Sequence, residues 1–353
     1  TGCRMKIWER HLLSELIKVF FLFLVSFYFL FILFDYSTHM REFSAGIDTT
    51  YVAEYYLCHL SKYMPVLIPL ALMVATIKVL SSLNQHRELV ALQVGGISTK
   101  KIARPFLLSA VCCIGLLYAN FQYWLPDAIA QIKCFEETYF TKERRFDPML
   151  SSVPLEDGSK LYYQRFFQSE MALFDVLWMQ SPDELWRIKS LTLTPSGPEG
   201  YFVDHLKREN GAFKLVGSHK HLPFPQIRLE TLSRSQFFTP FEARSFQELH
   251  SLLHSNVPFY VLKRNTIHTH WLHKWVLPLI SLTLVLAIFP RCVKFSRKTS
   301  IFSTYAWALF GFIVFYAVMG SAVIVGESIS PYYAILIPAF LPLMYFGGRF
   351  TWR

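Results

Sequence analysis

Six stretches of the chain are apolar over a length that can cross a bilayer, and polar segments separate them into two groups of three. A spanning helix needs about 20 mostly apolar residues. The first group comprises Leu16–Tyr36, Met64–Leu83 and Pro105–Leu125, and the second comprises Trp275–Pro290, Ile301–Val325 and Pro331–Gly348. The pattern predicts a polytopic α-helical membrane protein with six transmembrane helices.

The pattern changes in residues 126–263, between the two groups. Short runs rich in β-branched and aromatic residues, such as KLYYQRFF and LWRIKSLTLT, alternate with turn signals such as EDGS and PSGPEG. Many short strands with turn breaks are typical of a sandwich or a jelly-roll-like sheet. The segment SFQELHSLLHS, residues 245–255, has helical spacing with Ser245 as its N-cap, and we expect it to close this domain.

The chain is therefore expected to have three parts. Residues 1–125 hold the first three transmembrane helices, residues 126–263 form an inserted all-β, jelly-roll-like domain, and residues 264–353 hold the last three helices. Hydrophobic residues make up 53% of the chain and charged residues 17%, below the roughly 25% of soluble domains. This composition agrees with the membrane assignment.

Positive charge orients the predicted spans. The net charge is +10, and short connections that alternate along the chain are basic: Arg4, Lys6, Arg10 and Lys18; Arg87, Lys100, Lys101 and Arg104; Arg291, Lys294, Arg297 and Lys298; Arg349 and Arg353. Six spans place all four groups on one side, which the positive-inside rule assigns to the cytoplasm. Both termini are then cytoplasmic and the β domain lies outside. The charge excess indicates basic membrane loops and not a nucleic-acid partner.

The cytoplasmic connection between the second and third spans, RELVALQVGG, carries a short helical pattern. We expect a helix of about three turns near residues 84–96, some 15 Å long, that begins after Ser81, Ser82 or Asn84. Gly95-Gly96 should stop it. Its apolar stripe is Leu83, Val90, Val94 and Ile97, with Leu89 beside it. The pattern fits an amphipathic connector on the bilayer surface, and equally a coupling helix that docks into a groove on a cytoplasmic ATPase, where Glu88 would pair with a basic residue.

The same residues carry a family resemblance. ELVALQVGGIS resembles the E-L-x-A-L-x-x-x-G-x-S signature that follows the second span in LptF/LptG-type lipopolysaccharide export permeases, and the order of spans and β domain is similar throughout. The resemblance implies a coupling helix that contacts the ATPase LptB. Position by position, it assigns that contact to Glu88, Leu89, Ala91, Leu92 and Gly95. The sequence departs from the family pattern at Gln93-Val94, where Arg-Ala is common, and at WLHKWVLPL, where Glu and Arg are usual.

The function that the resemblance implies is a permease subunit in the bacterial inner membrane. Such a subunit of an ABC-type transporter extracts lipopolysaccharide or lipooligosaccharide and passes it to a periplasmic bridge of LptC/LptA type. It would pair with a second LptF/LptG-type permease and an LptB-like ATPase dimer. The sequence has no G-x-x-x-x-G-K-[ST] phosphate cradle, so ATP hydrolysis is expected in the partner, with no cofactor in this chain.

Basic residues near the outer membrane face are candidates for substrate binding, because lipopolysaccharide carries phosphates and acidic sugars. These are His39, Arg41, Lys62, Lys263, Arg264 and Lys274. Lysines and arginines that snorkel to the interface from membrane helices would produce the same pattern.

Two other functions compete with the permease hypothesis. His268, His270 and His273 open the fourth span and suggest a metal site of an intramembrane lipid-modifying enzyme, although an interfacial belt with Trp271 and Trp275 explains them as well. The chain could also be an anchor that presents a β domain. Cys58 and Cys134 fall on the same side of the membrane, where they either pair or remain free thiols.

Overall fold

The structure is a computed structural model that describes residues 6–43, 48–139, 151–154, 159–167, 172–181, 183–194, 197–209, 212–225, 227, 241–254, 263–293 and 301–351. The chain divides into two compact units. The membrane-helix unit comprises Thr1–Ile132, Pro240–Leu253 and Arg264–Arg353, and the β unit comprises Lys133–Thr239 and His254–Lys263.

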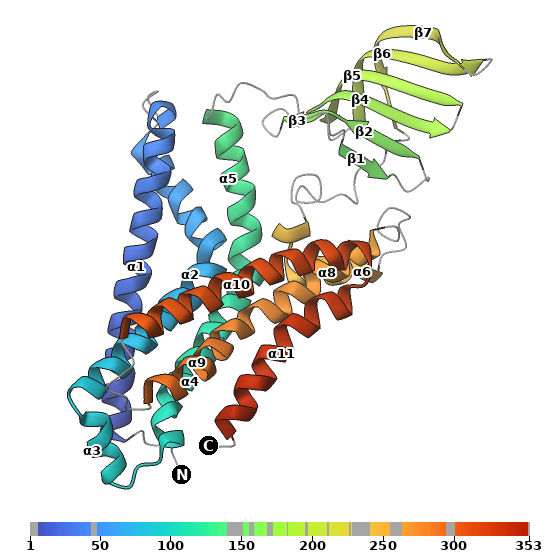
Figure 1. Cartoon of the computed structure of the whole chain (residues 1–353). Helices are drawn as coiled ribbons and strands as arrows, with labels where there is room; N and C mark the ends of the chain where they lie inside the picture. The colour runs from blue at the N-terminus through green and yellow to red at the C-terminus, as the bar shows by residue number, and fades with distance from the viewer. Residues whose placement is uncertain are drawn as a thin grey trace. The chain divides into compact units, whose positions relative to one another are not determined.

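Six helical spans form the membrane-helix unit, as the sequence predicts (Figure 1). The first is α1, Ile7–Phe43, and the second is α2, Thr49–Gln85. The third combines α4, Thr99–Ala119, a π-helix, Asn120–Trp124, and α5, Leu125–Tyr139. The fourth combines α8, Arg264–Val276, a 3₁₀ turn, Leu277–Leu279, and α9, Ile280–Val293. The last two are α10, Ile301–Ser328, and α11, Pro331–Thr351.

The expected start of the β domain at residue 126 shifts, whereas its expected end at Lys263 agrees with the end of the β unit. The third span does not end at residue 125, because α5 continues the helix to Tyr139. Within the expected domain, the 3₁₀ turn Phe241–Ala243 and α6, Phe246–His254, lie mostly in the membrane-helix unit. Ser245 is the N-cap of α6, as predicted. Its backbone N–H donates to Glu248 Oε2 at 3.1 Å and its Oγ accepts from the Glu248 N–H at 3.2 Å, which is a capping box.

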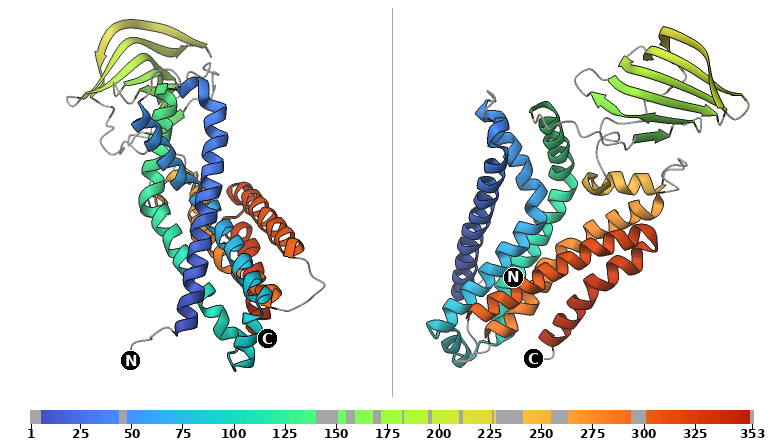
Figure 2. Two further views of the ribbon diagram at one scale, coloured as in Figure 1. Left: turned by 90° about the vertical axis from the view of Figure 1, so that its left-hand side faces the viewer. Right: turned by 45° about the horizontal axis from the view of Figure 1, so that its top comes forward.

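The core of the membrane-helix unit is built around α2. This helix packs against α1 and α9, and α4 also packs against α9, while α10 and α11 lie together beside α8 (Figures 1 and 2). Apolar side chains of α2, α4 and α9 fill the interior, among them Ile68, Leu72, Ala75, Phe106 and Ile288. The Thr76 hydroxyl inside it bonds back to its own helix, at 2.7 Å from the Leu72 carbonyl.

The described strands of the β unit form one antiparallel sheet inserted between the third and fourth spans, which confirms the predicted fold class. They are β1, Ser151–Pro154; β2, Lys160–Tyr163; β3, Arg165–Phe167; β4, Ala172–Ser181; β5, Glu184–Thr194; β6, Gly197–Glu209; and β7, Ala212–Pro223. The order across the sheet is β1-β2-β4-β5-β6-β7, and β3 also pairs with β4.

One face of this sheet carries a compact apolar core. Leu173, Val176 and Trp178 of β4 meet Ile188 of β5 and the ring of Phe224. A side chain at Gly200 could not coexist with that ring, because a Cβ there would lie 2.5 Å from Phe224 Cε2. The indole N–H of Trp178 donates to Ser159 Oγ at 2.9 Å, so its burial leaves no unmet donor.

Candidate docking site on the connection between α2 and α4

The connection between α2 and α4 contains a shorter helix than the sequence predicts. It is α3, Glu88–Val94, which has two turns and is about 10 Å long. None of Ser81, Ser82 and Asn84 caps it, because α2 continues through all three to Gln85. The chain turns instead at Arg87, whose φ of 59° is left-handed, and the new helix begins at the next residue.

Two glycines end α3 as predicted. Gly96 adopts φ 80°, a conformation that side-chain-bearing residues rarely take. The Gly96 N–H donates to the Gln93 carbonyl at 3.0 Å, and the Ile97 N–H donates to the Leu92 carbonyl at 3.1 Å. This pair of bonds is the Schellman motif, which satisfies the last carbonyls of a helix. The turn therefore fixes α3 relative to α4, which starts at Thr99.

The two faces of α3 differ from the expected stripe. Leu89 is buried in the main core, and Leu92 and Ile97 pack against that core. Of the predicted stripe, Val90 and Val94 are 39% and 83% exposed, whereas Leu83 at the end of α2 is buried. Leu89 and Leu92 are three residues apart, so both side chains lie on the inward face of α3. Val90 and Val94 therefore form an exposed apolar surface on a helix whose opposite face is packed in the core.

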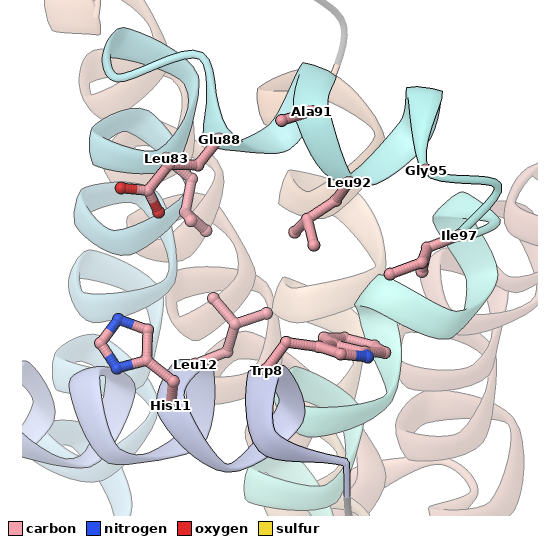
Figure 3. Close-up of a pocket in the computed structure, with 9 residues that line it drawn as sticks. All are labelled: Trp8, His11, Leu12, Leu83, Glu88, Ala91, Leu92, Gly95 and Ile97. Atoms are coloured by element: carbon pink, nitrogen blue, oxygen red, sulfur yellow. The ribbon is translucent and has the colours of Figure 1, made fainter.

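A pocket of about 380 Å³ lies beneath α3. Its mostly apolar walls come from the start of α1, the end of α2, α3 and the turn after it: Trp8, His11, Leu12, Leu83, Glu88, Ala91, Leu92, Gly95 and Ile97. Figure 3 shows the Glu88 carboxylate and the His11 ring facing each other across this pocket from α3 and α1. Both side chains belong to exposed residues. The pocket thus pairs an apolar floor with an acidic group at its edge.

Four of the five residues that the resemblance assigns to partner contact line this pocket, namely Glu88, Ala91, Leu92 and Gly95. Leu89 does not line it but anchors α3 in the core. The α1 side of the pocket, Trp8, His11 and Leu12, was missed, because about 80 residues separate it from α3 along the chain. The only sequence signal is one tryptophan among the polar residues that precede the first span.

The predicted substrate-binding residues lie in different surroundings. His39 Nδ1 is 3.1 Å from the Asp35 carbonyl oxygen on α1, and the exposed Lys62 has its Nζ 5.6 Å from the centre of the Tyr63 ring on α2. Arg264 is exposed at the start of α8, and Lys263 is exposed in the β unit. The side chain of Arg41 is outside the described residues.

Lys274 is not the exposed cation that the sequence suggested. It is only 3% exposed, and its ammonium donates to the carbonyl of Arg244, just before α6. Its Nζ also lies 5.6 Å from the centre of the Phe121 ring. Burial of an ammonium is costly unless it is bonded, and the carbonyl supplies that bond. Lys274 therefore attaches the segment before α6 to the fourth span.

Two of the three histidines of the fourth span contact different neighbours. His270 Nε2 lies 2.9 Å from Glu327 Oε1 of α10, a carboxylate remote in sequence, while the His268 ring packs 5.6 Å from that of Tyr332. Across the described part of the chain, no three His, Cys, Asp or Glu side chains are grouped so that they could hold a metal ion. Cys58 and Cys134 do not form a disulfide, and Cys58 Sγ donates to Gln131 Oε1 at 2.8 Å.

Comparison with known families decides between the hypotheses left open by the sequence. A family model described as "Lipopolysaccharide export system permease LptF/LptG" matches residues 10–351. The chain belongs to the LptF/LptG family. It is a permease of the lipopolysaccharide export system, a transporter subunit rather than an enzyme, and a multi-pass inner-membrane protein. A search of curated proteins found no match.

Proposed function

We propose that this LptF/LptG permease couples extraction of lipopolysaccharide or lipooligosaccharide to ATP hydrolysis in a separate LptB-like ATPase dimer, and that α3 docks into that ATPase. The observation that carries the proposal is the pair of faces on α3. Leu89 fixes the helix to the core, while Val90 and Val94 are exposed on its free side and Glu88 is exposed at the edge of the pocket beneath it. A rigid helix with an exposed apolar and acidic surface suits a groove on a partner protein.

The alternative, a helix lying on the bilayer surface, fits this geometry less well. An interfacial helix keeps basic residues on its polar face to meet anionic headgroups. The seven residues of α3 include one acid, Glu88, and no base. A groove lined with Arg or Lys would give Glu88 a charge-assisted hydrogen bond and would cover the two valines.

The basic connections support an orientation with α3 inside the cell and the β unit in the periplasm. In this orientation both termini are cytoplasmic, and the β unit passes acyl chains to a bridge of LptC/LptA type. The complex contains a second LptF/LptG-type permease, and the glycolipid enters between the first and fifth spans. The low burial of α1 and α10, at 6% and 17% of their apolar windows, supports this assignment. His39, Arg41, Lys62, Lys263 and Arg264 remain the proposed contacts for its anionic groups.

The direct test of docking is a charge reversal at Glu88. Glu88→Lys should weaken copurification of the ATPase and lower ATP-dependent glycolipid release, since removing one partner of an interfacial charge-assisted bond costs about 2–5 kcal/mol. Glu88→Gln keeps the shape and an acceptor, so its effect should be smaller. An acidic substitution in the ATPase groove should partly rescue Glu88→Lys.

The matched control is Glu54→Lys, which makes the same charge change at an exposed position near the start of α2. It should leave ATPase copurification at the wild-type level. If Glu88→Lys also binds ATPase and supports release as wild type does, α3 is a surface helix and the docking proposal fails.

A further inference from the structure

Two prolines interrupt the hydrogen-bond ladder of α2 inside the membrane. A proline has no backbone N–H, so the carbonyl four residues before it loses its helical donor. Pro65 frees the carbonyl of Ser61, and Pro69 frees the carbonyl of Pro65. Ser61 and both prolines are buried. An unbonded carbonyl at such a depth is costly, so these two acceptors need partners from elsewhere.

Side chains from two other spans supply those partners. Asn120 Nδ2 donates to the Ser61 carbonyl at 3.0 Å, and Ser61 Oγ donates back to Asn120 Oδ1 at 2.6 Å. The Tyr316 hydroxyl of α10 donates to the Pro65 carbonyl at 2.6 Å. Each carbonyl freed by a proline of α2 is therefore bonded to a different neighbouring span.

The neighbouring spans are themselves irregular where these contacts form. Asn120 is the first residue of the π-helix in the third span, and π-helical turns occur frequently at functional sites. In the fourth span the 3₁₀ turn Leu277–Leu279 replaces α-helix, and the Tyr118 hydroxyl donates to the Trp275 carbonyl just before it at 2.7 Å. The second, third and fourth spans thus each contain an irregular segment. Hydrogen bonds from side chains to backbone carbonyls link these segments.

The two halves of α2 have different attachments. The half after Pro69 is buried in the main core and leads, through His86 and Arg87, into α3. The half before Ser61 packs on α1, where the Tyr28 hydroxyl donates to the Tyr56 carbonyl. Just past Ser61, the rings of Phe31 and Tyr63 join the same two helices, with centres 4.5 Å apart. The proline segment therefore separates a part joined to the docking helix and to the start of α1 from a part joined to α1 around Tyr28 and Phe31.

We propose that residues 61–69 are a hinge of α2, and that Asn120 and Tyr316 are positioning residues that hold it by bonding its two freed carbonyls. Motion at the hinge carries a displacement of α3 to the part of α1 around Tyr28 and Phe31. Tyr316 lies on α10, most of whose surface is not covered by this chain, so movement of α10 makes or breaks its bond to Pro65. Only the claim that the displacement starts at α3 rests on the proposed function. The hinge itself does not.

The first test is a double-mutant cycle between Tyr316 and Pro69. Tyr316→Phe removes the donor and should lower Tm by about 2–4 °C, as expected for one lost bond. In a Pro69→Ala background the same substitution should change Tm little, because the new N–H at residue 69 can bond the Pro65 carbonyl. Tyr305→Phe on the same helix is the control and should leave Tm unchanged in both backgrounds. An equal loss from Tyr316→Phe in the two backgrounds would overturn the assignment of Tyr316 to the proline break.

The second test measures the hinge by spin-label distances. The native cysteines are replaced, and labels are placed at Leu57 and Lys78, which are exposed on either side of the proline segment. In an unbroken α-helix these Cα atoms would be about 32 Å apart. The purified wild-type chain should show two populations, at least one of them shorter than that of Pro65→Ala/Pro69→Ala, which should show one. Labels at Leu22 and Leu33 of the proline-free α1 should give one unchanged distance throughout.

The effect of nucleotide on the label distances then distinguishes a hinge from a fixed kink. In the complex with the ATPase, a non-hydrolysable ATP analogue should shift the wild-type populations and leave the double-alanine variant unchanged. The hinge proposal fails if the wild-type chain shows a single distance between the two labels that does not change when nucleotide binds. This holds even if that distance is shorter than in the Pro65→Ala/Pro69→Ala variant. If the ATPase does not bind the chain at all, the proposed function fails, while the two populations in the purified chain still decide the hinge.

Discussion

The first two spans are of equal length and lie side by side, yet they differ in what surrounds them. Both α1 and α2 have 37 residues. The protein buries 6% of the apolar window of α1 but 61% of that of α2. In a membrane every face of a helix is apolar, so hydropathy identifies a span without telling which face meets protein. Small and polar residues identify that face better, because they allow close packing and hydrogen bonds between helices.

The two sequences follow this rule. The window of α1 is dominated by Phe and Leu, whereas α2 carries Ala71, Ala75, Thr76 and two prolines among its aliphatic residues. The same contrast holds later in the chain, where α8 and α9 are mostly buried and α10 is mostly exposed. In the complex we propose, α2 and the fourth span form the packed core, and α1 and α10 present surfaces to lipid and to the second permease.

The largest expected effect is that of leucine truncation in the two spans. Leu72→Ala on α2 removes a side chain that is 1% exposed and leaves a cavity, which should destabilise the unit by about 2–5 kcal/mol. Leu30→Ala on α1, at 67% exposure, should have little effect. Thermal unfolding of both variants in detergent measures the difference. Equal losses of stability would mean that α1 is packed against protein in the isolated chain.

A smaller contrast is expected between two glycines of α10. A Cβ at Gly326 would lie 2.9 Å from Thr269 Oγ1 on α8, whereas one at Gly320 would meet nothing within 4 Å. Gly326→Ala should therefore push α8 and α10 apart at a cost of about 1–3 kcal/mol. Gly320→Ala should be neutral. A Gly326→Ala variant with wild-type Tm would show that α10 is not held against α8 at this point.

The smallest effects are expected at the outer basic residues. Replacing Arg41, Lys62 and Lys263 together with Ala should reduce photocrosslinking of acidic glycolipid, most clearly at low ionic strength, because salt screens exposed charges. One exposed ion pair contributes only about 0–1 kcal/mol, so single substitutions should change little. If glycolipid recovery from the triple variant is unchanged, these residues only anchor the helices at the membrane interface and do not bind substrate.

Lys274→Ala provides the contrast to that triple variant. Its ammonium is buried against the Arg244 carbonyl, so its loss should lower Tm without any dependence on salt. If Lys274→Ala instead lowers glycolipid crosslinking and leaves Tm unchanged, the residue contacts substrate.

The sequence predicted the features that depend on local pattern. Hydropathy located six spans, Ser245 was recognised as a cap, and Gly95-Gly96 as a stop. It did not predict the continuation of the third span into α5, because Pro126 and the polar residues after it resemble a helix end. The helix instead continues through the π-helix just before Pro126 into α5.

Features that depend on contacts remote in the sequence were not predictable. The start of α3 depends on where α2 ends, and the pocket depends on the start of α1 reaching α3. Lys274 looked like an outer cation because its backbone partner, the Arg244 carbonyl, is 30 residues away along the chain. The bonds to the freed carbonyls of α2 likewise join residues that no local pattern relates.

Site-specific photocrosslinking at Val94 tests the central claim, that α3 is the contact with the ATPase. Val94 is 83% exposed on α3, and Val111 is 57% exposed on α4, so both can carry a photoreactive side chain without disturbing the core. The account predicts that the probe at position 94 forms an adduct with the ATPase and that the probe at position 111 forms adducts with lipid. If both positions yield only lipid adducts in the assembled, ATP-hydrolysing complex, α3 lies on the membrane surface and the account is contradicted.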